Sequence, residues 1–339
     1  MRKTVFLGAL ALSWAVAGPG VAGVLDDVKA RGKVVCGVNE GLVGFASKDA
    51  NGAWEGFDVA MCRAVAAAVL GDPTAVTLKP TPAGVLQTSF ASGELDLLAR
   101  NTTWTFGNDV DTEAEFVGVT YYDGQGFMIR KDRGISSARD LNGYAVCVQA
   151  DTAALLNLAD YFRKNQMEYE AVPVKSNEEA QNRYLAGECN VYTTDASGLA
   201  AIRATFEDPK EHIILPEIIS KEPLGLVVRL GDNEWKQVVR WTLNALIAAE
   251  ELGVTSANVG ELAAQSSNNP EINRLLGTEG ELGKMLGLPA DWAVKAIQAG
   301  GNYGEIFEKN IGENTPIGLA RGLNAQWTNG GLLYALPFR

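Results

Sequence analysis

Residues 97–109, LLARNTTWTFGND, hold the polar side chains whose types and spacing most clearly suggest a binding site. An apolar strand is predicted from Leu97 to Ala99. It leads into Asn101 and Thr103, whose amide and hydroxyl groups can donate and accept hydrogen bonds. Small ligands of α/β proteins bind beyond the carboxyl ends of parallel strands. We therefore expect these two residues to stand in a polar ligand loop.

A second candidate is Asp195, in the run VYTTDASGLA after a predicted strand over 191–194. An ionised carboxylate can hold an ammonium group through charge-assisted hydrogen bonds. The alternative is that Asp195 only caps a helix that begins at Ser197. The spacing of the residues leaves both interpretations open.

The sequence gives little support for catalysis. The single histidine, His212, stands at a predicted strand start away from the ligand loops, and no nucleophile lies at a base-like spacing from it. The four cysteines are not spaced as metal ligands. We expect a protein that is not an enzyme and that binds neither a metal nor a cofactor.

The N-terminus is typical of a secretory signal. Arg2 and Lys3 precede an apolar run over 5–17, and small residues follow it up to Ala22 and Gly23. The run is short for a membrane span, and no lipoprotein-type cysteine follows it. We expect cleavage near Ala22 or Gly23 and a periplasmic protein.

Charge and composition narrow the function further. The formal net charge is −12, and it becomes more negative when the two basic residues of the signal are removed. Such an acidic chain does not neutralise nucleic-acid phosphates or adhere to anionic lipid. A hydrophobic content of 47% in 339 residues indicates a globular protein of two domains.

The predicted elements form two similar α/β units. The first has strands 34–38, 76–79 and 95–99 with helices 58–70 and 84–91, and the second has strands 144–149, 170–174 and 191–194 with helices 153–164 and 177–186. Extended segments 119–130 and 223–230 join the two units, as in a hinge. A helix over 234–252 has its apolar face at Trp235, Val238, Val239, Leu243 and Leu246, and it should return to the first unit.

The organisation therefore predicts two lobes. One comprises residues 24–122 and 228–339, with a C-terminal extension, and the other comprises residues 123–227. If the lobes move, disulfides within one lobe preserve the hinge, which selects Cys36–Cys62 and Cys147–Cys189. The predicted register opposes the second pair, because it places Cys147 nearer Tyr192. Buried free thiols are the alternative.

Segments spread over the whole mature chain resemble one family. They include WEGFDV at 54–59, CRAVAAAVLGDP at 62–73, RNTTWT at 100–105, GVTYYDGQGFM at 118–128 and GNYGEIFEKN at 301–310. The sequence resembles bacterial extracellular solute-binding proteins, family 3, which deliver polar amino acids to ABC transporters. It is most similar to the general L-amino-acid-binding subgroup.

The resemblance implies a fold and a set of ligand residues. The fold is the type II periplasmic binding protein fold, with two parallel-sheet lobes and a two-strand hinge. Asp195 matches the aspartate that holds the ligand's ammonium. The ligand head should also be contacted by Asn101 and Thr103, and Phe45 matches an aromatic that lies over the ligand, although Phe45 could equally pack in a core.

The carboxylate socket departs from the family pattern. The family places an arginine where this chain has Asn108, and a glycine before a threonine where this chain has Asp151 and Thr152. Asp151 would cap the following helix, occupy its N–H groups and repel a carboxylate. We expect a weakened carboxylate clamp and poor binding of common L-amino acids. The alternatives are a cationic or amide-like solute, an amino acid held through other donors such as Arg100, and lost binding.

The resulting hypothesis is a monomeric receptor that captures a small amine-bearing solute between its lobes and presents it to an ABC permease. The alternatives are a sensor partner with the same fold and, as the weakest, a dehydratase-like enzyme. The sequence does not identify the ligand or the permease.

Overall fold

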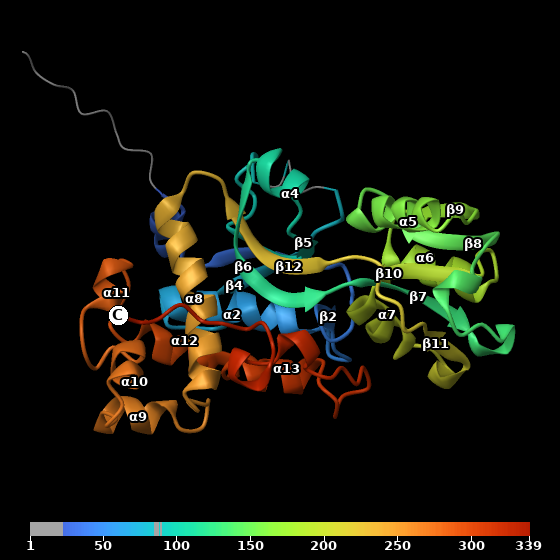
Figure 1. Ribbon diagram of the computed structural model, residues 1–339. Coiled ribbons are helices and arrows are strands. Elements are labelled where there is room, and N and C mark those ends of the chain that lie inside the picture. The colour runs from blue at the N-terminus through green and yellow to red at the C-terminus, as the bar shows by residue number, and fades with distance from the viewer. Residues whose placement is uncertain (1–22, 85–87, 89) are drawn as a thin grey trace, which may run out of the picture.

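Two lobes lie side by side, each a β-sheet with helices packed on it (Figure 1). The computed structural model of the chain describes residues 23–84, 88 and 90–339. The expected signal over 1–23 lies outside this range except for Gly23, and half of the expected helix over 84–91 lies outside it too. No helix in the described ranges is long and apolar enough to cross a membrane.

The first lobe contains a five-stranded sheet in the order β4-β1-β5-β12-β6. The parallel strands are β1 (Val34–Val38), β4 (Val76–Pro80) and β5 (Leu97–Thr103), whereas β12 (Glu222–Arg229) runs antiparallel to both β5 and β6 (Ala114–Asp123). The helix α2 (Phe57–Leu70) packs on this sheet through an almost wholly buried face. This sheet positions β5, which carries the predicted ligand loop.

The second lobe repeats the plan with the order β11-β7-β10-β8-β9. Strands β8 (Tyr144–Gln149), β9 (Tyr169–Val174) and β10 (Val191–Asp195) are parallel, whereas β7 (Gln125–Arg130) is antiparallel to β10 and to β11 (His212–Ile214). The helices are α5 (Ala153–Lys164), α6 (Asn177–Leu185) and α7 (Ala196–Arg203). The predicted two-lobed α/β fold is confirmed, with one antiparallel strand inserted in each sheet.

The chain crosses between the lobes twice. On the way out, Gly124 alone separates β6 from β7, and a Cβ atom there would lie 2.2 Å from a methyl carbon of Ile218 and 2.8 Å from the carbonyl oxygen of Ser220. Glycine therefore permits the close approach of the outward and returning segments. All of β12 pairs with first-lobe strands, so we place the return crossing just before Glu222 rather than at the expected boundary of 227 and 228.

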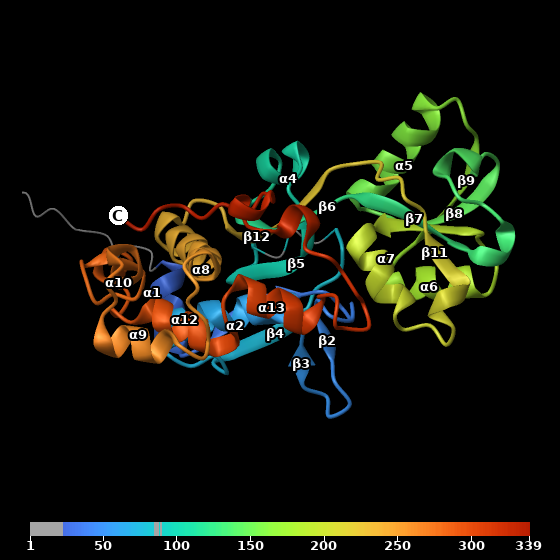
Figure 2. The ribbon, with the colours of Figure 1, turned by 60° about the horizontal axis from the view of Figure 1, so that its bottom comes forward.

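The C-terminal extension builds onto the first lobe (Figure 2). Helix α8 (Asn233–Glu251) buries the five apolar residues that its sequence predicts, and α12 (Trp292–Gly300) packs along α2. The extension also contains α9 (Val259–Gln265), α10 (Pro270–Leu275), α11 (Leu282–Met285) and α13 (Tyr303–Asn310).

The helices α1 (Val24–Arg31) and α4 (Phe106–Val110) lie earlier in the chain.

The extension also fixes the edge of the first sheet at the hinge. Asn324, buried beyond the last helix, accepts from the backbone N–H of Tyr122 at 2.7 Å and donates to its carbonyl at 3.1 Å. The hydroxyl of Tyr303 donates to the carbonyl of Thr120 at 2.7 Å. Strand β6 is thereby covered where its backbone would otherwise be an unpaired edge.

Both disulfides join groups within one lobe. Cys36 on β1 is bonded to Cys62 on α2, with Cα atoms 6.1 Å apart, and Cys147 on β8 is bonded to Cys189, with Cα atoms 5.6 Å apart. The expectation that the strand register excludes the pair Cys147–Cys189 is wrong. The register itself was predicted correctly, since Tyr192 lies opposite Cys147. Cys189 precedes β10 and does not extend that strand, so its position does not follow the strand register.

Candidate functional site

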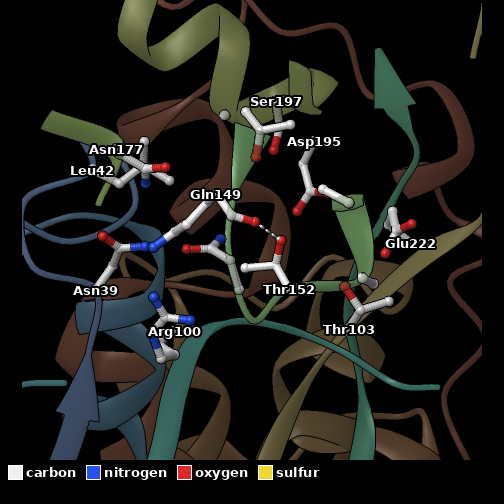
Figure 3. A pocket seen from close by; sticks show the side chains of 15 residues that line it. Asn39, Leu42, Arg100, Thr103, Gln149, Thr152, Asn177, Asp195, Ser197 and Glu222 are labelled. Carbon is white, nitrogen blue, oxygen red and sulfur yellow. Dashed lines mark hydrogen bonds between the residues drawn. The ribbon is translucent and has the colours of Figure 1, made fainter. Parts of the chain in front are cut away.

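A polar cavity lies between the lobes, where parallel strands of both sheets end (Figure 3). It has a volume of about 70 Å³ and opens beside a second cavity of about 430 Å³. The lining residues of the first cavity come from both lobes and from one hinge strand: Asn39, Leu42, Arg100, Asn101, Thr103, Gln149, Thr152, Ala153, Ala154, Asn177, Thr194, Asp195, Ser197, Gly198 and Glu222.

Three residues of strand β5 line this cavity, but they lie in the strand and not in the predicted loop after it. The strand continues to Thr103, and its pairing with β12 shifts between Gly225 and Val227. Asn101 has a left-handed backbone, with φ of 58°, which asparagine tolerates better than most residues. This bulge re-aims the chain, so that Arg100, Asn101 and Thr103 all line the cavity.

Asp195 lies at the N-cap position of α7, yet its side chain makes no capping hydrogen bond. The carboxylate of Asp123 does so instead, accepting from the N–H of Ser197 at 3.3 Å and from the N–H of Gly124 at 2.8 Å. The helix begins at Ala196, one residue earlier than expected. The carboxylate of Asp195 is therefore left for the cavity.

Three carboxylates gather at this end of the cavity. Burial, reinforced by the charges of Asp123 and Glu222, raises the pKa of Asp195 well above its usual value, and only Arg100 opposes that shift. Burial also raises the pKa of Asp123 to about 6, against the hydrogen bonds from Ser197 and Gly124. Such a cluster favours a bound cation, because a cation offsets both the burial and the mutual repulsion.

Arg100 stands on the opposite side of the cavity, beside Asn39 and Gln149 (Figure 3). Its Nε donates to the carbonyl of Thr81 at 3.0 Å. Burial lowers the pKa of this guanidinium, and the charges of Glu40, Asp58 and Asp195 oppose the shift. A guanidinium held in this way can bind a carboxylate or an amide oxygen.

The N-terminus of α5 is open toward the cavity. Asp151 is exposed in a left-handed conformation, with φ of 58°, and it is not the N-cap. Thr152 takes that position, but its hydroxyl donates to the carbonyl of Gln149 at 2.8 Å and caps nothing. The expectation that Asp151 would occupy the helix N–H groups is wrong. The left-handed backbone also gives a physical reason for a glycine at this position.

Two predicted ligand residues lie off the cavity. Phe45 is fully buried in the core of the first lobe, with its ring centroid 6.1 Å from that of Phe57 and 5.9 Å from that of Tyr121. Asn108 lies on α4, where its side-chain amide donates to the carbonyl of Thr103 at 2.9 Å. Phe45 and Asn108 therefore do not line the cavity, whereas Asn101, Thr103, Thr152 and Asp195 line it together. That these residues contact a ligand stays a prediction.

The sequence of residues 34–258 matches the bacterial extracellular solute-binding proteins, family 3. The chain belongs to this family. It is 58% identical to the glutamate/glutamine/aspartate/asparagine-binding protein BztA of Rhodobacter capsulatus over the full length of both proteins. It is 55% identical to the general L-amino acid-binding periplasmic protein AapJ of Rhizobium johnstonii, over 94% of this chain and 93% of AapJ.

One solved structure has nearly the same fold. It is an ABC transporter/periplasmic binding protein from Brucella ovis with glutathione bound, 54% identical, with a TM-score of 0.91 over 94% of this chain and all of that chain. The resemblance found in the sequence is confirmed. The relatives named here are binding proteins by name.

Several residues that line this cavity were not predicted from the sequence. Gln149 ends a predicted strand and Asn177 begins a predicted helix, so the rule that ligands lie at strand ends could have found them. Glu222 would have been harder to predict, because the sequence shows only an acidic residue at the start of an apolar strand that returns to the first lobe. Its place beside Asp195 depends on how the hinge crosses between the sheets.

Proposed function

We propose that this protein is the periplasmic receptor of an amino-acid ABC transporter, and that it binds a polar amino acid between its lobes. The observation that carries the proposal is the distribution of charge in the cavity. Carboxylates of Asp195 and Glu222 line one side and the guanidinium of Arg100 lines the other (Figure 3). A dipolar solute can satisfy both sides at once.

The three groups of an amino acid have separate partners in this arrangement. The ammonium lies at Asp195. The α-carboxylate meets the N–H groups of Ala153 and Ala154 at the start of α5, where anions are favoured. A side-chain carboxylate or amide meets Arg100. Glutamate, glutamine, aspartate and asparagine have these groups, and the name of the relative BztA supports that choice.

The adjoining cavity favours a second candidate. Its 430 Å³ exceeds the space in the first cavity, and the two share Arg100, Gln149 and Asn177. A peptide that begins with a glutamyl group could place its head in the first cavity and its remainder in the second. The glutathione-bound relative from Brucella ovis supports this candidate.

A thermal-shift screen of the mature protein tests the proposal. Ligands that bind the folded state raise the melting temperature by mass action. The panel contains the twenty common L-amino acids, glutathione, γ-aminobutyrate and putrescine. We expect the largest rises with acidic or amide amino acids or with glutathione. A panel in which no compound raises the melting temperature would contradict the proposal.

Recovery of the bound compound separates a receptor from an enzyme. We expect mass spectrometry to recover every binding compound unchanged after prolonged incubation. Conversion of the compound would support the dehydratase-like alternative. A permease that is stimulated by the loaded protein in proteoliposomes would distinguish a transport receptor from a sensor partner.

A further inference from the structure

Each crossing between the lobes carries a carboxylate that is at least partly buried. Strand β6 ends at Asp123 and strand β12 begins at Glu222, and these two residues lie opposite each other in the antiparallel register. Glu222 is 2% exposed and Asp123 is partly buried. Asp195, at the end of β10, lies near both of them. The hinge itself therefore places negative charge beside the ligand site.

Glu222 has one satisfied oxygen and one unsatisfied oxygen. Glu222 is 2% exposed. Its Oε1 accepts a hydrogen bond from Nδ2 of Asn157 at 2.6 Å and another from Oγ of Ser220 at 2.5 Å. Oε2 is buried and has no hydrogen-bond partner within the described ranges of the chain. Because Glu222 lines the cavity, a donor on a ligand is the group that would satisfy this oxygen.

We infer that Glu222 is a second carboxylate of the amine socket. When the ligand's ammonium binds there, it displaces a proton that Asp123 and Asp195 share in the ligand-free protein. The ammonium then donates to Asp195 from the second lobe and to Oε2 of Glu222 from the hinge. The displaced proton passes to the buffer. This inference rests on the proposed function, since it concerns the amine of the same solute.

The groups around the socket support a shared proton. Asp123 and Asp195 both titrate above the usual range of an aspartate, because they are buried and stand near each other and Glu222. Arg100 is the cation whose charge acts on Asp195. The phenols of Tyr121 and Tyr192 are also close enough for the charge of Asp195 to raise their pKa values. Three full negative charges in so small a space repel strongly.

A purely structural role for Glu222 makes a different prediction. In that case the carboxylate would only hold Asn157 and Ser220 at the hinge. Its replacement by glutamine would change stability, but it would leave unchanged the number of protons released when a ligand binds. Proton release is therefore the measurement that separates the two roles.

Isothermal titration calorimetry in two buffers of different ionisation enthalpy measures that number. The probes are L-glutamate, L-glutamine and glutathione, used at pH 6 and pH 8. We expect proton release at pH 6, little at pH 8, and tighter binding at the higher pH. The variant Glu222→Gln should lose about tenfold to a hundredfold in affinity and release fewer protons. The matched control Glu170→Gln, on the exposed face of β9, should behave as the wild type.

Equal proton release by the wild type and Glu222→Gln would overturn the inference. A titration of the ligand-free protein, with the side-chain carboxyl signals followed by carbon NMR, provides an independent check. We expect a signal with a midpoint near or above 6 that moves in Glu222→Gln, whereas its absence would remove the shared proton. If no probe binds, the proposed function fails, and the titration still decides on the proton.

Discussion

The carboxylate of Asp195 and the guanidinium of Arg100 face one cavity from opposite lobes (Figure 3). Their charges interact, because each opposes the pKa shift that burial causes in the other. Water in the cavity cannot neutralise either group as well as an ion can. A solute that carries an amine and an anionic or amide group can serve both residues and so draw the lobes together.

Replacement of Asp195 by alanine should weaken binding of amine-bearing ligands by about tenfold to a hundredfold. The reason is the loss of a charge-assisted hydrogen bond worth about 1.5–3 kcal/mol. Calorimetry with the ligand found in the thermal-shift screen measures the effect. The control Asp160→Ala, an exposed acid on α5, should leave affinity unchanged. Unchanged affinity in Asp195→Ala would assign this residue a structural role.

Replacement of Asp195 by asparagine should change stability in a pH-dependent way. The raised pKa of Asp195 means that the folded protein holds a proton which the unfolded chain releases, so stability falls as the pH rises above the usual carboxyl range. Asp195→Asn should therefore raise the melting temperature of the ligand-free protein at pH 7.5. The difference should shrink as the pH falls through the ordinary aspartate pKa of 3.8 and disappear only well below it, where the wild-type group is protonated in both states.

Replacement of Arg100 by methionine should remove the preference for acidic and amide side chains. Affinity for L-glutamate should fall by about tenfold or more, since a charged hydrogen bond is lost while the volume is kept. Competition among glutamate, glutamine and alanine measures the preference. Arg139→Met, on the surface of the second lobe, is the control. Retained preference for glutamate would show that another donor reads the side chain.

Restoring the family residues Asn108→Arg and Asp151→Gly should improve binding of common L-amino acids. Asn108 lies off the cavity beside Thr103, so only the longer side chain of an arginine there could add a bidentate partner for the carboxylate. The glycine would remove a repelling charge and suit the left-handed backbone, but it would not free the helix N–H groups, which Asp151 does not cap. A double-mutant cycle tests whether the gain exceeds the sum of the two. Sub-micromolar binding of glutamate or glutamine by the unmodified protein would contradict the expected weak clamp.

Both disulfides should contribute to stability. They close separations of 26 and 42 residues, for which the loop-entropy model gives about 3–4 kcal/mol each. Urea unfolding of Cys36→Ser with Cys62→Ser, and of Cys147→Ser with Cys189→Ser, measures the losses. The second pair should lose slightly more. An equal unfolding midpoint for the wild type and both double variants would show that the loop-entropy model overstates the stabilisation by these disulfides.

Residue order along the chain determined most of the fold. The predicted strand 144–149 and helix 153–164 coincide with β8 and α5, and α8 buries the predicted apolar face. These features depend on periodicity and on neighbours within a few residues, which the sequence contains directly. The position of Asp195 at the end of a strand follows from the same local pattern, whereas Thr103 was expected in a loop after Ala99 and instead ends β5 itself.

Only the tertiary structure decided which side chains reach the cavity between the lobes. Asn108 turns to the carbonyl of Thr103, Phe45 packs against Tyr121, and Glu222 faces the socket from the returning hinge strand. Cys189 forms a disulfide with Cys147, although the predicted strand register placed Tyr192 nearer to Cys147. Each outcome depends on a contact or a bulge between segments far apart in the chain, and such contacts exist only once both sheets and the hinge are assembled.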